Sequence, residues 1–165
     1  MFKKIVLFVL VMFPVIAFAQ EKIAYVNYGD VILAMPEYKQ MMDSLKKSDA
    51  EYQTELKALS DEYSKKLSDY IAQRDSLNES IRTRREQDLD GLRERAANFQ
   101  QEAQQKQEDL QQSLSVPIQN KLQKAISDVG SENNYLYIAN SQAMLYISPT
   151  ALDATPLVKK KLGIQ

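Results

Sequence analysis

Apolar residues recur every three or four positions through a long central stretch of the chain. Between Glu37 and Val116 this stretch contains one glycine and no proline. A packed core is interrupted by turn residues at short intervals, so an uninterrupted run of this length predicts extended helix. The first apolar ladder consists of Tyr38, Met42, Leu45, Tyr52, Leu56, Leu59, Tyr63, Leu67, Tyr70, Leu77 and Ile81, with Asp49 and Arg74 filling two positions of the same spacing.

A second, weaker ladder follows and predicts a second helix packed against the first as a coiled-coil hairpin. Its members are Leu89, Leu92, Ala96, Phe99, Ala103, Leu110, Leu114 and Ile118. From Gln100 to Asp109 the only apolar residue is Ala103, so the two helices bury little at that level. We therefore expect a flexible arm that is stiffest near its base.

The reversal between the helices is predicted near Asn78, where residues 75–80 offer Asp, Ser and Asn side chains for turn and cap hydrogen bonds. Gly91 is the alternative position. A turn near Asn78 puts three arginines at the tip, and a solvated helix start is favoured over an anion site for them. They are Arg82, Arg84 and Arg85. Surface ion pairs are expected within the helices, namely Asp61 with Lys65, Glu62 with Lys66 and Glu102 with Lys106.

Short apolar segments flank the helical run and predict a small sheet. Ile23–Tyr28 is a strand candidate rich in β-branched and aromatic residues, followed by a short helix with Asp30 as its cap that ends at Pro36. Beyond the arm, a helix is predicted through Pro117, which should bend it, to a stop at Gly130. The remaining elements are a hairpin of Leu136–Asn140 with Met144–Ile147, then a helix capped by Thr155, with Pro156 first and Gly163 at its end.

These elements predict an α+β fold of two parts. Residues 20–36 and 117–165 form a body of 66 residues, and residues 37–116 form the helical hairpin arm. A single core of that size supplies only about 3–5 kcal/mol when no disulfide or metal supports it. The body is therefore expected to pool its strands with those of other copies of the chain.

The first 19 residues predict a secretory signal peptide. Lys3 and Lys4 precede an apolar stretch from Ile5 to Ile16, and Ala17-Phe18-Ala19 provides small residues before a cut after Ala19. About 12 apolar residues are too few to span a bilayer, which requires about 20. The residue after the cut is Gln20 and not Cys, so no acylated anchor is implied. A soluble, exported mature chain is expected.

Composition excludes several classes of function. The chain has no Cys and no His, so the usual zinc, copper and iron ligand sets, the thiol nucleophile and the commonest general base are missing. Lys3 and Lys4 leave with the signal peptide, so 19 Lys and Arg remain against 22 Asp and Glu, and a net charge of −3 does not attract nucleic acid. We predict no enzymatic activity, no catalytic, cofactor-binding or metal-binding residues, and no cofactor.

Several segments, taken in order, resemble the Skp/OmpH-type periplasmic chaperones. They are Ile23-Ala24-Tyr25-Val26-Asn27, Pro36-Glu37-Tyr38-Lys39, the stretch from Pro117 to Ile126, Asp153-Ala154-Thr155, and Leu162-Gly163. The resemblance covers essentially the whole mature chain. It implies a homotrimer with a central β body and three arms around a cavity, which holds unfolded outer-membrane proteins without ATP.

One feature departs from the family. Its well-known members are strongly basic, whereas the span from Glu37 to Val116 has 13 Lys and Arg against 17 Asp and Glu. The net negative charge of this span disfavours electrostatic capture of clients or of lipopolysaccharide. Tyr52, Tyr63 and Tyr70 are amphipathic enough to contact clients, although packing between the helices is the favoured role. An envelope spacer and a lipid or lipopolysaccharide carrier that uses the tip arginines are the alternative functions.

Overall fold

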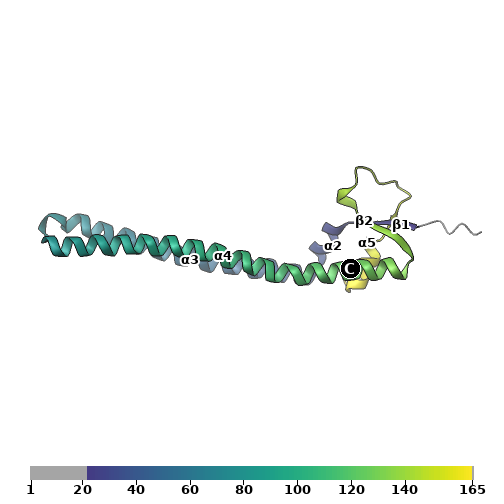
Figure 1. The fold of residues 1–165 in the computed structure, drawn as a ribbon, viewed down its shortest axis with the longest axis horizontal. Helices are drawn as coiled ribbons and strands as arrows, with labels where there is room; N and C mark the ends of the chain where they lie inside the picture. The colour runs from purple at the N-terminus through teal and green to yellow at the C-terminus, as the bar shows by residue number, and fades with distance from the viewer. Residues whose placement is uncertain (1–21, 165) are drawn as a thin grey trace, which may run out of the picture.

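The protein consists of a long, thin arm and a small body at one end of it (Figure 1). A computed structural model describes residues 22–164. The predicted signal peptide, residues 1–19, and its cleavage site lie outside the described residues. The arm is entirely helical and the body combines a sheet with helices, which confirms the α+β fold and the hairpin arm.

The arm is formed by two antiparallel helices joined by a tight turn. Helix α3 spans Pro36–Gln73, the 3-10 turn η2 spans Arg74–Ser76, and helix α4 spans Glu79–Glu132. Asn78 caps α4, with its side chain accepting a hydrogen bond from the backbone N–H of Ile81 at 3.0 Å. The prediction of a reversal near Asn78 is confirmed. The Gly91 alternative is wrong because that residue lies inside α4.

Helix α4 continues from the arm into the body without interruption. Pro117 lies inside it, so the predicted passage of helix through this proline is confirmed, while a bend there stays a prediction. The helix ends at Glu132 and not at Gly130. Asn133 caps it, and Asn134 then adopts a positive φ of 54°, a conformation that asparagine tolerates better than most residues. The end of the helix is thus set by an asparagine pair rather than by the glycine.

The sheet of the body contains three parallel strands in the order β2-β1-β3. They are β1, Lys22–Val26; β2, Tyr135–Asn140; and β3, Leu152–Asp153. The short helix α2, Tyr28–Ala34, follows β1; the 3-10 turn η3, Ser141–Ala143, follows β2; and α5, Thr155–Leu162, follows β3. Strand β1 lies in the middle, so segments from both ends of the chain meet at the base of the arm.

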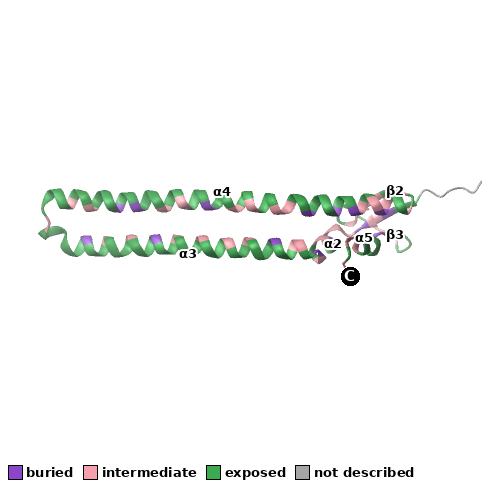
Figure 2. Ribbon diagram, turned by 90° about the horizontal axis from the view of Figure 1, so that it is seen from below, coloured by how far each residue is buried: buried purple, intermediate pink, exposed green. Residues whose placement is uncertain are grey.

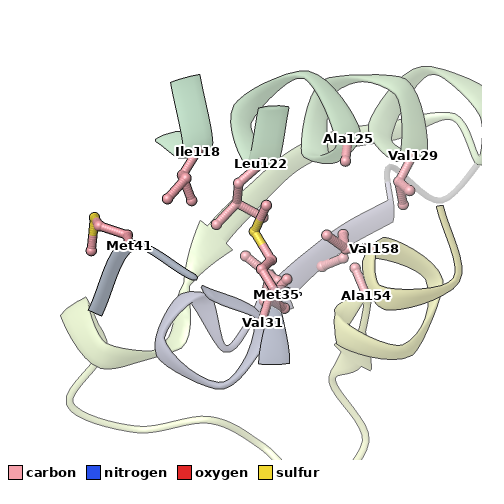
Figure 3. Packing of buried hydrophobic residues seen from close by; sticks show 11 residues of the cluster. Val31, Met35, Met41, Ile118, Leu122, Ala125, Val129, Ala154 and Val158 are labelled. Atoms are coloured by element: carbon pink, nitrogen blue, oxygen red, sulfur yellow. The ribbon is translucent and has the colours of Figure 1, made fainter. Parts of the chain in front are cut away.

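One apolar cluster holds these elements together. Leu122 and Val129 of α4, Val31 of α2, Val158 of α5 and Val26 of β1 are almost completely buried in it. Figure 3 shows the side chain of Leu122 directed toward that of Met35, between the helices that line the cluster. In the described residues the body therefore has one core, to which α2, α4, α5, one face of β1 and Met41 at the base of α3 contribute.

Two predicted helix caps are wrong. Helix α2 is capped by Asn27, whose side chain accepts a hydrogen bond from the N–H of Asp30 at 3.1 Å, so Asp30 lies inside the first turn. Thr155 is the first residue of α5 rather than its cap. Its hydroxyl instead accepts a hydrogen bond from the backbone N–H of Asn27 at 2.9 Å, which ties α5 to the end of β1. The predicted stop at Gly163 is confirmed by its left-handed φ of 73°.

The predicted hairpin of Leu136–Asn140 with Met144–Ile147 is also wrong. The first segment lies within β2, but the second forms no strand. Strand β2 pairs in parallel with β1, and the chain then loops across to β3, which pairs with the other edge of β1. Met144–Ile147 lies in the loop from β2 to β3 and pairs with no strand in the described chain.

Candidate functional site

The seam between α3 and α4 determines which side chains the arm buries and which it presents. Buried positions on the two helices face one another along the arm, and most of the remaining surface is exposed (Figure 2). In the lower arm the seam uses Met41, which is 7% exposed, rather than the predicted Met42, which is 47% exposed. Likewise Ser48 is half-buried where Asp49 was expected. The regular 3-4 spacing is kept by the sequence Tyr38, Met41, Leu45, Ser48, Tyr52.

The three candidate tyrosines of the arm lie on this seam. Tyr52 packs edge-on against Phe99 of α4, with 6.1 Å between ring centroids and 72° between ring planes. Tyr63 is half-buried, and Tyr70 is buried and donates its hydroxyl hydrogen bond to Glu86. That hydrogen bond to Glu86 raises the pKa of Tyr70, as does burial. Packing between the helices therefore accounts for these side chains.

The tip arginines do not act as one group. The guanidinium of Arg82 lies over the turn, where its Nη2 is 3.4 Å from the carbonyl oxygen of Leu77 and 3.5 Å from that of Arg74. Arg84 is exposed and Arg85 is half-buried. Arg82 is thus engaged in holding the reversal, which leaves two arginines for any ligand at the tip.

The ion pairs of the arm lie on its surface, with one pair joining the helices at the base. Glu62 pairs with Lys66 at 2.8 Å as predicted, but Asp61 pairs with Lys57 at 2.7 Å and not with Lys65. The expected pair of Glu102 with Lys106 is absent from the ion pairs of residues 22–164. Exposed pairs of this kind contribute little to stability.

At the base of the arm, Lys121 of α4 contacts Glu37 in the first turn of α3. The hydrogen bond from Lys121 lowers the pKa of Glu37. In the body, Lys161 of α5 bonds to Glu132 and also lies 3.8 Å from Asp128 of α4. The hydrogen bond to Glu132 raises the pKa of Lys161, while Lys124 lowers that of Asp128. These pairs join the start of α3 and the end of α5 to α4.

The sheet of the body leaves an apolar face uncovered. Ala24 and Val26 of β1 point into the core, whereas Ile23 is 55% exposed and its register partner Tyr137 of β2 is 63% exposed. Parallel sheets are normally covered on both faces, because their strands carry apolar residues on each side. We define the uncovered face as the side chains of Ile23 and Tyr137. No described element of the chain packs over it.

Further apolar residues are exposed in the loop from β2 to β3. Leu145 is fully exposed, and Tyr146 is largely exposed. Both belong to the Met144–Ile147 segment, which was predicted as a strand and has no strand partner. The body thus exposes apolar side chains in two places, on the uncovered face of the sheet and in the loop from β2 to β3.

Residues 22–164 contain no group of three or more acidic side chains placed to hold a metal ion. Among the same residues, no helix is both long and apolar enough to cross a membrane. The features available for binding are the long polar surface of the arm and the uncovered apolar face of the body.

A comparison with protein families matches residues 22–162 to the family described as Outer membrane protein (OmpH-like). The match runs from β1 to the end of α5 and so includes both the body and the arm. A search of curated proteins finds no match to the chain.

Proposed function

The chain belongs to the OmpH-like family, and from this we propose that it is an ATP-independent holdase that encloses unfolded outer-membrane proteins between its arms. Family membership points to a chaperone of outer-membrane proteins and not to an enzyme. It likewise points to the periplasm. The enclosure, the absence of ATP and the export by a signal peptide of residues 1–19 are parts of the proposal.

The observation that carries the proposal is the exposure of apolar side chains on the body, both on the uncovered face and in the Met144–Ile147 segment. We infer that Ile23 and Tyr137, together with Met144–Ile147, are covered by other copies of the chain in a homotrimer. The number three comes from the family resemblance. Assembly is supported by the size of the body, since a 66-residue core alone supplies only about 3–5 kcal/mol. Covering the face adds buried apolar area at about 25 cal/mol per Å².

Assembly through the body would leave the arms projecting side by side. Helix α3 has 38 residues, which corresponds to about 57 Å at 1.5 Å per residue. Three arms of that length enclose a volume in which a client is separated from other clients. The arms need no nucleotide or metal for this role, because enclosure uses many weak contacts rather than a chemical step.

The carrier alternative receives less support from the geometry. A lipid or lipopolysaccharide site at the tip was expected to use three arginines, and Arg82 is engaged with the carbonyl groups of the turn. The spacer alternative predicts the same assembly without any effect on clients. An assay of client aggregation distinguishes the proposed function from both the carrier and the spacer alternatives.

The test is dilution of a urea-denatured outer-membrane β-barrel into buffer with and without the protein, with turbidity recorded over time. Suppression at about one trimer per client, unaffected by ATP or by a chelator, is the expected result. Equal turbidity in both samples would refute the holdase function and leave the spacer.

Assembly is tested separately by light scattering on the mature chain. The expected mass is that of three chains, and Tyr137→Lys should lower it because a charge would be buried in the interface. The control is Leu33→Lys, at an exposed position of α2, which should leave the mass unchanged. A monomeric wild-type protein at micromolar concentration would contradict the trimer.

A further inference from the structure

A groove lies between the two helices partway along the arm, at the level of Ala103. It is lined from α3 by Tyr52 and Gln53, and from α4 by Gln100, Ala103, Gln104 and Gln111. Ala103 is buried in the seam but contributes only a methyl group. We call this the amide groove, because five of its ten lining residues are glutamines, namely Gln53, Gln100, Gln104, Gln107 and Gln111.

The seam at this level breaks the packing rule that holds elsewhere on the arm. Gln107 occupies a seam position, and its Nε2 donates to the carbonyl oxygen of Leu45 across the helix pair at 3.0 Å. Its Oε1 is buried and has no hydrogen-bond partner in the described chain. A buried acceptor without a partner lowers stability, and a leucine would avoid this cost. Sites where a sequence departs from good packing without a visible gain are candidates for function.

The chemistry of the lining indicates the class of ligand. A glutamine amide carries donors and an acceptor of the same kind as the backbone N–H and C=O groups of a peptide. A row of such amides can therefore pair with an extended backbone whatever its side chains are. Asp49 and Glu108 also line the groove, so an anionic ligand such as a lipid phosphate is disfavoured there.

We propose that the amide groove binds an extended segment of an unfolded polypeptide by hydrogen bonding to its backbone. This inference rests on the proposed holdase function and assigns part of it to one place on the arm. Each amide–backbone bond adds little when it replaces a bond to water. Binding of this kind is weak, replaceable and independent of sequence, as holding varied clients requires.

The chain offers a matched pair of variants to test this. Three glutamines of the groove on α4, Gln100, Gln104 and Gln111, are each followed by an exposed glutamine that is not among the groove lining. The groove variant is Q100L, Q104L and Q111L. The control variant is Q101L, Q105L and Q112L. Both have the same composition, and each loses one glutamine–carboxylate bond, from Gln104 to Glu108 or from Gln105 to Asp109.

The probe is a fluorescein-labelled peptide of about ten residues copied from one strand of an outer-membrane β-barrel. Fluorescence anisotropy measures its binding to the full-length assembled protein. The groove variant should bind about tenfold more weakly than wild type, which corresponds to about 1.4 kcal/mol, while the control variant should bind as wild type does. A peptide with methyl groups on alternate backbone nitrogens should bind wild type about tenfold more weakly as well. Circular dichroism checks that both variants remain helical.

Other outcomes overturn the inference. If the groove variant binds as tightly as wild type, the amides of the groove do not hold the peptide, and if it binds more tightly, apolar contact holds the peptide instead. If both variants weaken equally, the effect is not specific to the groove. In each case wild type can still suppress client aggregation, and the proposed function then stands without the groove. If wild type fails to suppress aggregation and binds no peptide, the proposed function and the inference fail together.

Discussion

Replacing Leu122 with alanine tests whether the small body depends on its single core. Leu122 is 0% exposed and belongs to the cluster of α2, β1, α4 and α5. Burial of one leucine contributes about 1.5–3 kcal/mol, and the cavity left behind raises the cost of a buried Leu→Ala change to about 2–5 kcal/mol. A core of this size supplies about 3–5 kcal/mol. The substitution should therefore remove most of the stability that one body has by itself.

The assay is urea denaturation followed by circular dichroism at several protein concentrations. Leu122→Ala should lower the midpoint and make it more dependent on concentration, because only assembled bodies then remain folded. Leu33→Ala is the control, since that side chain is 58% exposed and its removal should change stability by less than about 0.5 kcal/mol. If the two variants unfold at the same midpoint, the cluster around Leu122 does not hold the body together.

Three further predictions concern the arm. Removing residues 52–107 and rejoining the helices with a short turn should leave a protein that still assembles as a trimer, with three times the mass of the shortened chain, but no longer protects clients. Retained protection in the turbidity assay would place the client surface on the body. The lowered pKa of Glu37 means that its pairing with Lys121 stabilises the fold above pH 4.5 and is lost as the pH falls further, so Glu37→Gln should weaken the acid dependence of the urea midpoint slightly; an identical pH profile would contradict this. The raised pKa of Tyr70 means that its bond to Glu86 stabilises the fold below pH 10.0 and is lost at higher pH, so Tyr70→Phe should flatten the alkaline decline in melting temperature; a decline as steep as that of wild type would refute it.

The features predictable from sequence are those with local causes. The reversal of the arm follows from Asn78, whose side chain bonds within its own turn, and the end of α5 follows from a glycine with positive φ. The helices themselves follow from the length of the apolar ladders. In each case the residues that cause the structure are within a few positions of it.

The features that sequence reasoning missed depend on distant residues. Met41 and Met42 are equivalent in local pattern, and only the position of α4 decides that Met41 is buried. Thr155 is a good cap residue, but its hydroxyl is taken by Asn27 from the other end of the chain. Met144–Ile147 has the composition of a strand, yet β2 pairs with the distant β1, and Met144–Ile147 stays in the loop that leads to β3. The division of the chain at residues 36/37 and 116/117 stays a prediction.

The amide groove and Gln107 were visible in part. The sequence shows that Gln100–Asp109 is poor in apolar residues, which predicts weak burial. It does not show that Gln107 reaches the carbonyl of Leu45, nor that its other amide atom lacks a partner, because both depend on the register between α3 and α4. Interhelical register is a property of the whole hairpin and is not set by any one residue.

The position of β1 at the centre of the sheet has a consequence for the order in which the protein folds. β1 emerges first during synthesis, yet its neighbours β2 and β3 emerge near the end, and Asn27 bonds to a residue 128 positions later. A flexible loop of that length would slow the meeting of the strands. The hairpin shortens the search, because its helices can zip together from Asn78 and bring the two sides of the body close. The arm would then act as a folding aid for the body to which it belongs.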